Sequence, residues 1–257
     1  MKKRIISILL ITMMVLSMAA CKKSDKTFVL GLDDTFAPMG FRDDNNKIVG
    51  FDVDLAQAVC DKLGYKLKLQ PIDWNSKEQE LNTKNIDCIW NGFSITKENQ
   101  EKFLMTPAYM KNEISLVVKK DSTIASNADM SGKKLAVQAG SSAEQTLNGD
   151  ENKAFKDSLG KINPFSSYNT ALQDVETGNS DAVLMDSVMA NYLINEQGKD
   201  FKVLNDTLSE DAYGIGFRKE DTKLCDDVWN ALKELKKDGK VAEISKKWFG
   251  SDITTIE

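Results

Sequence analysis

The chain has 257 residues, 41% hydrophobic and 28% charged, with a formal net charge of −5, which suits one large or two modest globular domains. No long basic cluster lies outside the extreme N-terminus, which argues against nucleic acid as a partner. The absence of histidine excludes Ser-His-Asp and Cys-His catalysis and the common zinc sites. Neither GxGxxG nor a P-loop motif occurs, and no carboxylate pair stands out as an acid/base dyad. We therefore expect no enzyme activity, no catalytic residue, no metal site and no cofactor.

The first twenty residues have the pattern of a secretory signal. Residues 2–4 are basic, residues 5–18 are mostly apolar, and Ala19 and Ala20 precede Cys21. The apolar run ends too soon for a transmembrane helix. The sequence MAAC resembles a bacterial lipobox, which implies cleavage before Cys21 and lipidation of its thiol; plain secretion with an incidental cysteine is the alternative. We expect residues 1–20 to be removed and the lipid at Cys21 to anchor the mature chain outside the cytoplasm.

The first part of the mature chain alternates strand and helix patterns. A polar tether over residues 21–26 is followed by a strand at 27–32, a turn-rich loop or hairpin at 33–51 and an amphipathic helix at 52–63 that Gly64 closes. A strand at 65–71, a short helix at 76–83 and a buried strand at 86–90 follow. A polar turn is expected directly after that strand. This alternation predicts βαβ units and a mostly parallel sheet.

The second part repeats this pattern. Strands are predicted at 134–138 and 182–185, helices at 140–147 and 170–177, and a short strand or turn at 163–168. Ser141 and Glu144 fit a capping box at the start of the first of these helices. The segments LNTKNIDCIWN (81–91) and VETGNSDAVLM (175–185) echo each other. This repeat suggests two similar α/β lobes.

Two further strand-like runs, at 114–119 and 213–217, lie between the predicted lobes, and two amphipathic helices at 225–235 and 241–248 end the chain. If both runs cross between lobes, lobe one comprises residues 27–112 and 213–257, lobe two comprises residues 113–212, and a cleft lies between them. The remaining cysteines, Cys60, Cys88 and Cys225, are odd in number and show no ligand spacing. We expect buried thiols; one disulfide with a thiol left over is the alternative.

Several motifs in this order resemble the extracytoplasmic solute-binding proteins of ABC importers, polar amino-acid type (family 3). The motifs are GLDDTFAPMGF, IVGFDVDLAQAV, NIDCIWNGFSIT, KLAVQAGSS, SDAVLMDS and LKKDGKVAEISKKWFG. The resemblance implies a two-lobed periplasmic-binding-protein-like α/β fold, with a mixed sheet flanked by helices in each lobe, that closes on its ligand by hinge motion. It implies a monomer that captures an amino acid or related amine and delivers it to a permease. A dehydratase-like enzyme on the same scaffold is the alternative.

The resemblance also implies a pocket in the first lobe. Phe36 and Trp74 match aromatic walls against which a ligand side chain stacks, although both also suit an ordinary core. Asp33 matches an acidic position that either reads a polar ligand side chain or caps its own turn. Asn91, Gly92 and Ser94 match the stretch that grips the ligand ammonium and carboxylate, with a self-satisfied polar turn as the alternative.

In the second lobe, Ser141 and Ser142 match a turn that holds the ligand carboxylate at a helix N-terminus, a role compatible with helix capping. Asp186 ends a buried strand and matches the carboxylate that pairs with the ligand ammonium. An acid at so apolar a strand end needs a partner.

The segment WNGFSITKENQ departs from the family at Asn99, where the resemblance implies an arginine that clamps the ligand carboxylate with two parallel bonds. Thr96 is the predicted N-cap of the helix that contains Asn99. Lys97 and Lys111 are expected to be solvated. We expect either that backbone amides at Thr96 and Ser142 hold the carboxylate alone, in a pocket without a fixed positive charge, or that the ligand is not a standard α-amino acid.

Overall fold

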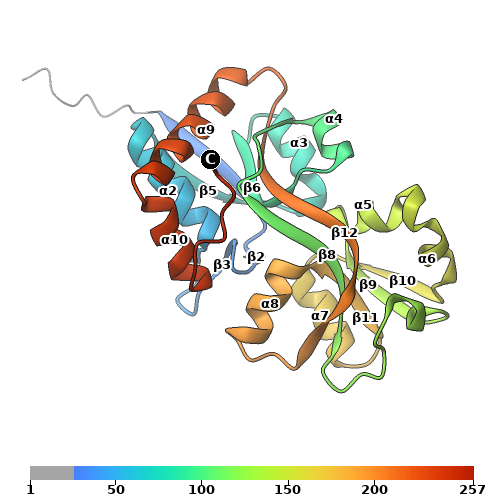
Figure 1. Ribbon diagram of the computed structural model, residues 1–257. Helices are drawn as coiled ribbons and strands as arrows, with labels where there is room; N and C mark the ends of the chain where they lie inside the picture. The colour runs from blue at the N-terminus through green and yellow to red at the C-terminus, as the bar shows by residue number, and fades with distance from the viewer. Residues whose placement is uncertain (1–25) are drawn as a thin grey trace, which may run out of the picture.

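The computed structural model describes residues 26–257. The predicted signal peptide, the lipidation site Cys21 and all of the tether except Lys26 lie outside the described residues. Two groups of elements lie side by side, and two long strands, β8 (Met110–Lys119) and β12 (Phe201–Phe217), run between them (Figure 1). We call the elements on the β6 side of these strands lobe one and those on the β11 side lobe two.

The predicted α/β fold is confirmed, and the strands of its main sheet form one hydrogen-bonded path. The order is β10-β9-β11-β8-β12-β6-β1-β5, and β7 pairs with β12. The pairs β1–β5, β1–β6, β9–β10 and β9–β11 are parallel, whereas β8 pairs with β11 and β12 in antiparallel fashion. Because β8 and β12 are central, the sheet of one lobe continues into that of the other.

Lobe one contains β1, β5 and β6, a small sheet of three short strands, and five helices. The strands are β1 (Thr27–Leu32), β2 (Thr35–Phe36), β3 (Gly40–Arg42), β4 (Ile48–Val49), β5 (Lys66–Pro71), β6 (Cys88–Ser94) and β7 (Leu104–Met105). The α-helices are α2 (Phe51–Leu63), α3 (Lys77–Asn82), α4 (Lys97–Lys102), α9 (Thr222–Lys237) and α10 (Lys240–Phe249), and the 3₁₀ turn η2 (Trp74–Ser76) precedes α3. The expected hairpin over 33–51 is thus present, and Gly64 ends α2 in the left-handed conformation.

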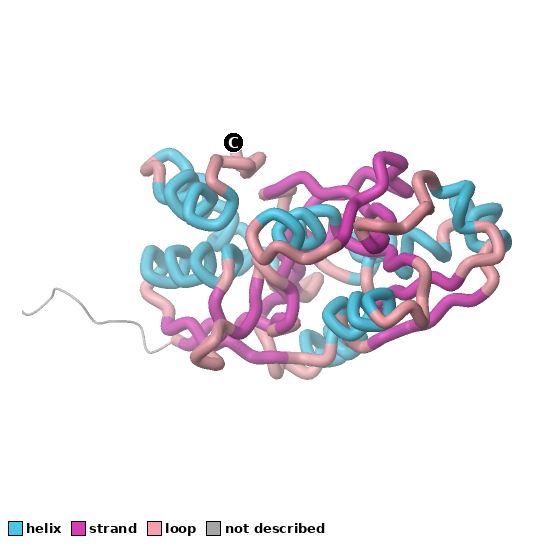
Figure 2. The backbone as a smooth tube through the Cα atoms, turned by 90° about the horizontal axis from the view of Figure 1, so that it is seen from below, coloured by secondary structure: helices cyan, strands magenta, loops and turns pink. Residues whose placement is uncertain are grey.

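Lobe two repeats the pattern with fewer strands. The strands are β9 (Lys134–Gln138), β10 (Lys161–Phe165) and β11 (Ala182–Asp186). The helices are α5 (Ser142–Asn148), α6 (Lys153–Ser158), α7 (Tyr168–Glu176) and α8 (Ser187–Asn195), with 3₁₀ turns η3 (Asn127–Met130) and η4 (Asp150–Asn152). Helices lie around the strands in both halves of the molecule (Figure 2).

Three sequence expectations need correction. Strand β6 runs on through residues 91–94, where a polar turn was expected, because Tyr213 and Gly214 of β12 pair with Ser94 and Phe93. Strand β12 is 17 residues long, not five, because β8 supplies hydrogen-bond partners along most of it. Helix α8 was not predicted, and it follows β11 directly. Pairing between distant segments decides such lengths, and local patterns do not show it.

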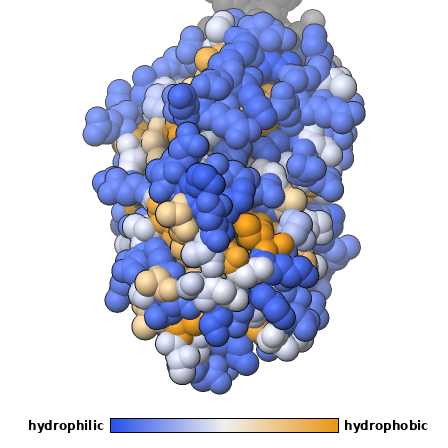
Figure 3. Space-filling model, turned by 90° about the vertical axis from the view of Figure 1, so that its right-hand side faces the viewer, coloured by the Kyte–Doolittle hydropathy of each residue, from blue (hydrophilic) through white to orange (hydrophobic). Residues whose placement is uncertain are grey.

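The main apolar core runs through both lobes, and a second cluster around Trp74 and Phe93 lies in lobe one. Cys60, Cys88 and Cys225 are free and buried, which confirms the expected thiols and rules out a disulfide among them. Within residues 26–257, no helix has the length and apolarity needed to span a bilayer. The face at the α5–α6 end is mostly hydrophilic, with small scattered apolar patches (Figure 3).

Candidate functional site

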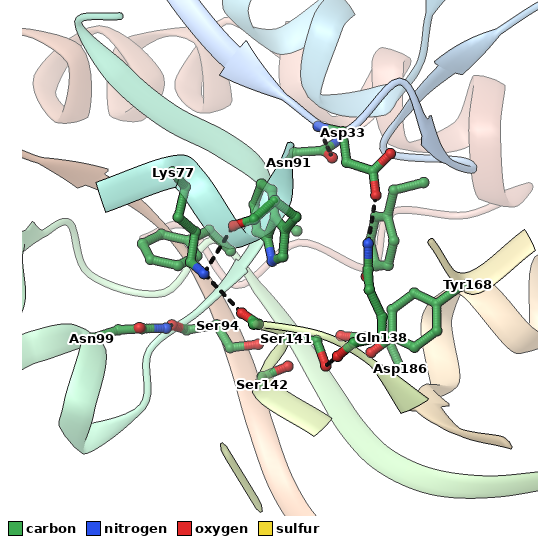
Figure 4. Close-up of a pocket in the computed structure, with 15 residues that line it drawn as sticks. Asp33, Lys77, Asn91, Ser94, Asn99, Gln138, Ser141, Ser142, Tyr168 and Asp186 are labelled. Carbon is green, nitrogen blue, oxygen red and sulfur yellow. Dashed lines mark hydrogen bonds between the residues drawn. The ribbon is translucent and has the colours of Figure 1, made fainter. Parts of the chain in front are cut away.

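A small pocket lies between the lobes, lined by polar and aromatic side chains from both of them (Figure 4). It is lined by Asp33, Phe36, Trp74, Lys77, Asn91, Gly92, Phe93, Ser94, Asn99, Gln138, Gly140, Ser141, Ser142, Tyr168 and Asp186. Three of its polar side chains come from strand ends: Asp33 follows β1, Gln138 ends β9 and Asp186 ends β11. In open α/β sheets, the carboxyl ends of strands are where ligands bind.

Gly92 allows the backbone of β6 to come close to the pocket. Its φ is +57°, a conformation that favours glycine, and a Cβ there would lie 2.7 Å from Phe36 Cε1. The buried Asp52 accepts a hydrogen bond from the Gly92 N–H at 2.7 Å and another from Tyr109 Oη at 2.9 Å. Complete burial raises the Asp52 pKa to about 7. Asp52 therefore holds the strand in place from behind the pocket.

Asp186 is the central buried acid of the site. Its Oδ1 accepts hydrogen bonds from Asn112 Nδ2 at 2.7 Å and from Tyr213 Oη at 2.8 Å. Asn112 Nδ2 also donates to Asp211 Oδ2 at 2.7 Å, and so joins the two carboxylates. Burial, and secondly the charge of Asp211, raise the Asp186 pKa to about 7. Among residues 26–257, no basic side chain forms an ion pair with either acid, although a cation would stabilise both.

Asp33 uses both carboxylate oxygens within the protein. Oδ1 accepts from the Thr35 N–H at 2.9 Å and from the Thr35 hydroxyl, which is the turn-capping role. Oδ2 accepts from Gln138 Nε2 of lobe two at 2.8 Å (Figure 4). Burial raises the Asp33 pKa. The bond between Asp33 and Gln138 links the two lobes inside the pocket.

Asn99 occupies the position at which an arginine was expected, and both ends of its amide form hydrogen bonds. Nδ2 donates to the Ser94 carbonyl at 2.9 Å, and Oδ1 accepts from Gln145 Nε2 of lobe two at 3.2 Å. Thr96 Oγ1 donates to Gln145 Oε1 at 2.9 Å and accepts from the Asn99 N–H at 3.1 Å, as the predicted N-cap. The side chains of Thr96 and Asn99 thus form hydrogen bonds to Gln145 of lobe two. Neither provides the positive charge that an arginine at position 99 would carry.

Lys77 supplies the positive charge that the sequence did not reveal. Its side chain is only 8% exposed at the start of α3. Nζ donates to the Trp74 carbonyl at 3.2 Å and, across the lobes, to the Gly140 carbonyl at 2.7 Å (Figure 4). Burial lowers the Lys77 pKa to about 8. The expectation of a pocket without a fixed positive charge is therefore wrong. Lys97 and Lys111 are exposed, as expected.

Aromatic rings form the walls. Phe36 of lobe one lies 5.8 Å, centroid to centroid, from Tyr168 of lobe two. Trp74 meets Phe93 edge to face at 5.8 Å and belongs to the second apolar cluster, so it is both wall and core.

Ser141 caps α5 by accepting the Glu144 N–H at 3.1 Å. The Glu144 carboxylate bonds to the Gly140 N–H instead of completing the predicted capping box.

Comparison with known proteins places this arrangement in a family. A model of the bacterial extracellular solute-binding proteins, family 3, matches residues 28–251. The chain belongs to this family.

Several family members are similar over most of their length. The chain is 31% identical over 234 residues to the L-cystine-binding protein TcyJ of Escherichia coli K12, covering 90% of this chain and 86% of that protein. A Streptococcus pneumoniae ABC uptake transporter substrate-binding protein, solved with bound histidine, superposes with a TM-score of 0.87 at 43% identity, over 91% of this chain and 96% of that one. The structure of Tv2483 bound to L-arginine superposes with a TM-score of 0.84 at 28% identity, over 90% of this chain and 93% of that one. The first two are binding proteins by name, and the third was solved with a bound amino acid.

For this family member, ten of the eleven predicted ligand-binding residues line the pocket, and Thr96 does not. Sequence reasoning missed Lys77, Phe93, Gln138, Gly140 and Tyr168. Gln138 could have been found, because it is a polar residue at the end of a buried strand, like Asp186. No local signal marks Lys77, since nothing in the helix pattern SKEQELN (76–82) distinguishes a buried lysine from a solvated one.

Proposed function

We propose that this protein binds a small polar amino acid in the pocket between its lobes and delivers it to the permease of an ABC importer. The observation that carries the proposal is Asp186, a buried carboxylate that lines the pocket and has no basic partner among residues 26–257. A ligand ammonium would offset the cost of its burial and of the neighbouring Asp211. The ligands named for the relatives, cystine, histidine and arginine, all carry an ammonium.

The rest of the pocket suits the other parts of an amino acid. Ser142 forms no side-chain hydrogen bond within the described residues, so its hydroxyl is available to a ligand oxygen. Ser94 and Ser141 line the same region, although their hydroxyls already donate to Asp211 and to the Gln138 carbonyl. The ligand side chain would lie between Phe36 and Trp74, near Asp33.

The proposed lobe boundaries are residues 27–112 with 213–257, and residues 113–212. The support is the sheet order, in which β8 and β12 are the two strands joining both sides. Three hydrogen bonds join the lobes at or beside the pocket: Gln138 and Gln145 of lobe two donate to Asp33 and Asn99, and the Gly140 carbonyl accepts from Lys77. We propose that these bonds form when the lobes close on the ligand by bending of β8 and β12.

The family is extracytoplasmic, and we propose that a lipid on Cys21 anchors this member to the cell membrane after removal of residues 1–20. We further propose that it acts as a monomer. Within the described residues, Ile253, at 39%, is the only large apolar side chain that is substantially exposed, so no apolar surface calls for a partner copy. The dehydratase-like alternative would require turnover of the bound solute, which product analysis after long incubation would reveal.

Ligand identity tests the proposal directly. Native mass spectrometry of the protein as purified, followed by titration calorimetry with the standard L-amino acids, L-cystine and neutral sugars, should give binding of at least one amino acid and none of the sugars. Binding of sugars alone, or chemical conversion of the bound amino acid, would contradict the proposed function.

A further inference from the structure

The charges within the pocket are separated. Asp186, which Asn112 joins to Asp211, provides negative charge where β11 ends. Lys77 projects its ammonium from α3 (Figure 4). Asn99 is neutral and both ends of its amide are engaged. Lys77 is therefore the only basic side chain among the described residues that line the pocket.

Lys77 has no counter-ion of its own among residues 26–257. Its Nζ donates to two backbone carbonyls, Trp74 and Gly140, lies over the Trp74 ring at 5.3 Å from the ring centroid, and enters no ion pair. An ammonium has three donors, so one is not accounted for by these two bonds. A buried charge without a partner is costly, and a ligand that provides one gains the corresponding interaction.

The charged groups around Lys77 are already engaged with one another. Glu78 of α3 and Glu98 of α4 both bind Lys102, at 3.2 and 2.9 Å. Glu144 of α5 accepts from the Gly140 N–H. Lys102 opposes the charge of Lys77, and the three glutamates favour it, but burial outweighs them and leaves the Lys77 pKa lowered to about 8. No protein group neutralises this ammonium.

We propose that Lys77 takes the place of the missing arginine, holds the ligand carboxylate through Nζ, and so selects zwitterionic amino acids over amines that lack the carboxylate. This inference rests on the proposed function. Because Nζ also bonds to the Gly140 carbonyl of lobe two, a carboxylate bound there contacts the junction of the two lobes. An ammonium is a single point of charge, so this contact lacks the two parallel bonds that an arginine makes.

Calorimetry on matched ligands and variants tests the inference. The probes are the tightest-binding L-amino acid of the panel and its carboxamide, which keeps the ammonium and side chain but lacks the negative charge. Lys77→Gln should weaken binding of the amino acid by about tenfold or more, as expected for a lost charge-assisted bond, and change binding of the carboxamide by less than about threefold. Lys97→Gln, which removes an exposed lysine, should change neither.

Equal loss for both probes, or no loss for either, would overturn the inference and leave the proposed function standing, since the wild-type protein still binds an amino acid. If the wild-type protein binds no amino acid at all, both the inference and the proposed function fail.

A measurement on the wild-type protein avoids dependence on the folding of the variant. The ¹³C signal of the Lys77 ε-methylene should titrate near the pKa of about 8 in the free protein. Binding of the amino acid should raise that pKa by about one unit or more, because an adjacent carboxylate favours the charged form. An unchanged or further lowered pKa in the complex would show that the ligand carboxylate does not lie at Lys77.

Discussion

At the scale of single residues, the pocket contains groups whose burial costs stability until a ligand is bound. Asp186 and Lys77 are both buried, and burial shifts both pKa values toward the uncharged form, to about 7 and about 8. A zwitterion offers each of them the opposite charge. Binding of a zwitterion would thus offset the free-energy cost of burying the two charged side chains, which is a physical reason for such groups to be present in a binding site.

Asp186→Asn should abolish ligand binding and stabilise the free protein. Because the Asp186 pKa is raised from 3.8 to about 7, its protonated form is favoured by folding. Its contribution to the free energy of unfolding is therefore fully present below about pH 4 and is lost as the pH rises through about 7. Asparagine keeps the Oδ1 acceptor for Asn112 and Tyr213, so the neutral variant should be more stable at pH 8 by roughly 1–3 kcal/mol.

Thermal unfolding at pH 5 and pH 8, without ligand, measures this difference, which should be larger at pH 8. The matched control is the exposed Asp44→Asn, which should behave as wild type at both values. A variant that is less stable at pH 8, or that binds amino acids with wild-type affinity, would contradict the assignment of the ligand ammonium to Asp186.

At the scale of secondary-structure elements, α5 and the segment around α4 hold the lobes together beside the pocket. The Gln145 amide on α5 bonds to Thr96 Oγ1 at 2.9 Å and to Asn99 Oδ1 at 3.2 Å. At the place where an arginine was expected, this protein thus has a bond between lobes. The resemblance implied a residue that holds a ligand charge at this position, whereas Asn99 forms a hydrogen bond to the other lobe.

Gln145→Ala should favour the open arrangement of the lobes. Two partly buried neutral hydrogen bonds contribute about 1–2 kcal/mol together, so ligand affinity should fall by roughly 5–30-fold. Titration calorimetry gives the affinity, and small-angle X-ray scattering without ligand should show a larger radius of gyration. Gln173→Ala, on the exposed side of α7 in the same lobe, is the control. If affinity and radius both match wild type, the contacts of Gln145 are incidental to closure.

At the scale of the whole molecule, the hydrogen-bonded path from β10 to β5 passes from lobe to lobe only through β8 and β12. The pairing of β8 with β12 shifts register between Val203 and Thr207 and again between Thr207 and Ser209. Such irregularities bend and twist a strand. The long crossing strands are therefore suited to bend when the lobes move.

Cys21→Ala should release the protein from the membrane fraction. The lipobox-like MAAC segment motivates the expectation, and the acyl chains of a lipoprotein provide the anchor, since one chain alone binds only marginally. Fractionation of cells that express the variant, followed by immunoblotting, measures the distribution. Ser24→Ala, in the predicted tether, should remain membrane-bound. Persistence of the Cys21→Ala protein in the membrane fraction would count against lipidation at that cysteine.

The sequence by itself determined the α/β class, most helices and strands, and most of the residues that line the pocket. The elements predicted from local patterns are present in the structure. These patterns are Gly64, the alternation over 65–71, and the apolar runs at 134–138 and 182–185. Ordered motifs of the family led to Asp33, Asn91 and Asp186. Asp33 and Asp186 lie at the carboxyl ends of β1 and β11, where ligands bind in open α/β sheets.

Only the tertiary structure decided which groups act together. The role of Lys77 depends on its burial against Trp74 and on the Gly140 carbonyl, 63 residues away in the other lobe. The length of β12 depends on β8, and the engagement of Asn99 depends on Gln145. Solvent exposure and neighbouring groups decide what a charged side chain can do in a site. Both depend on contacts between distant segments, which no local pattern of residues contains.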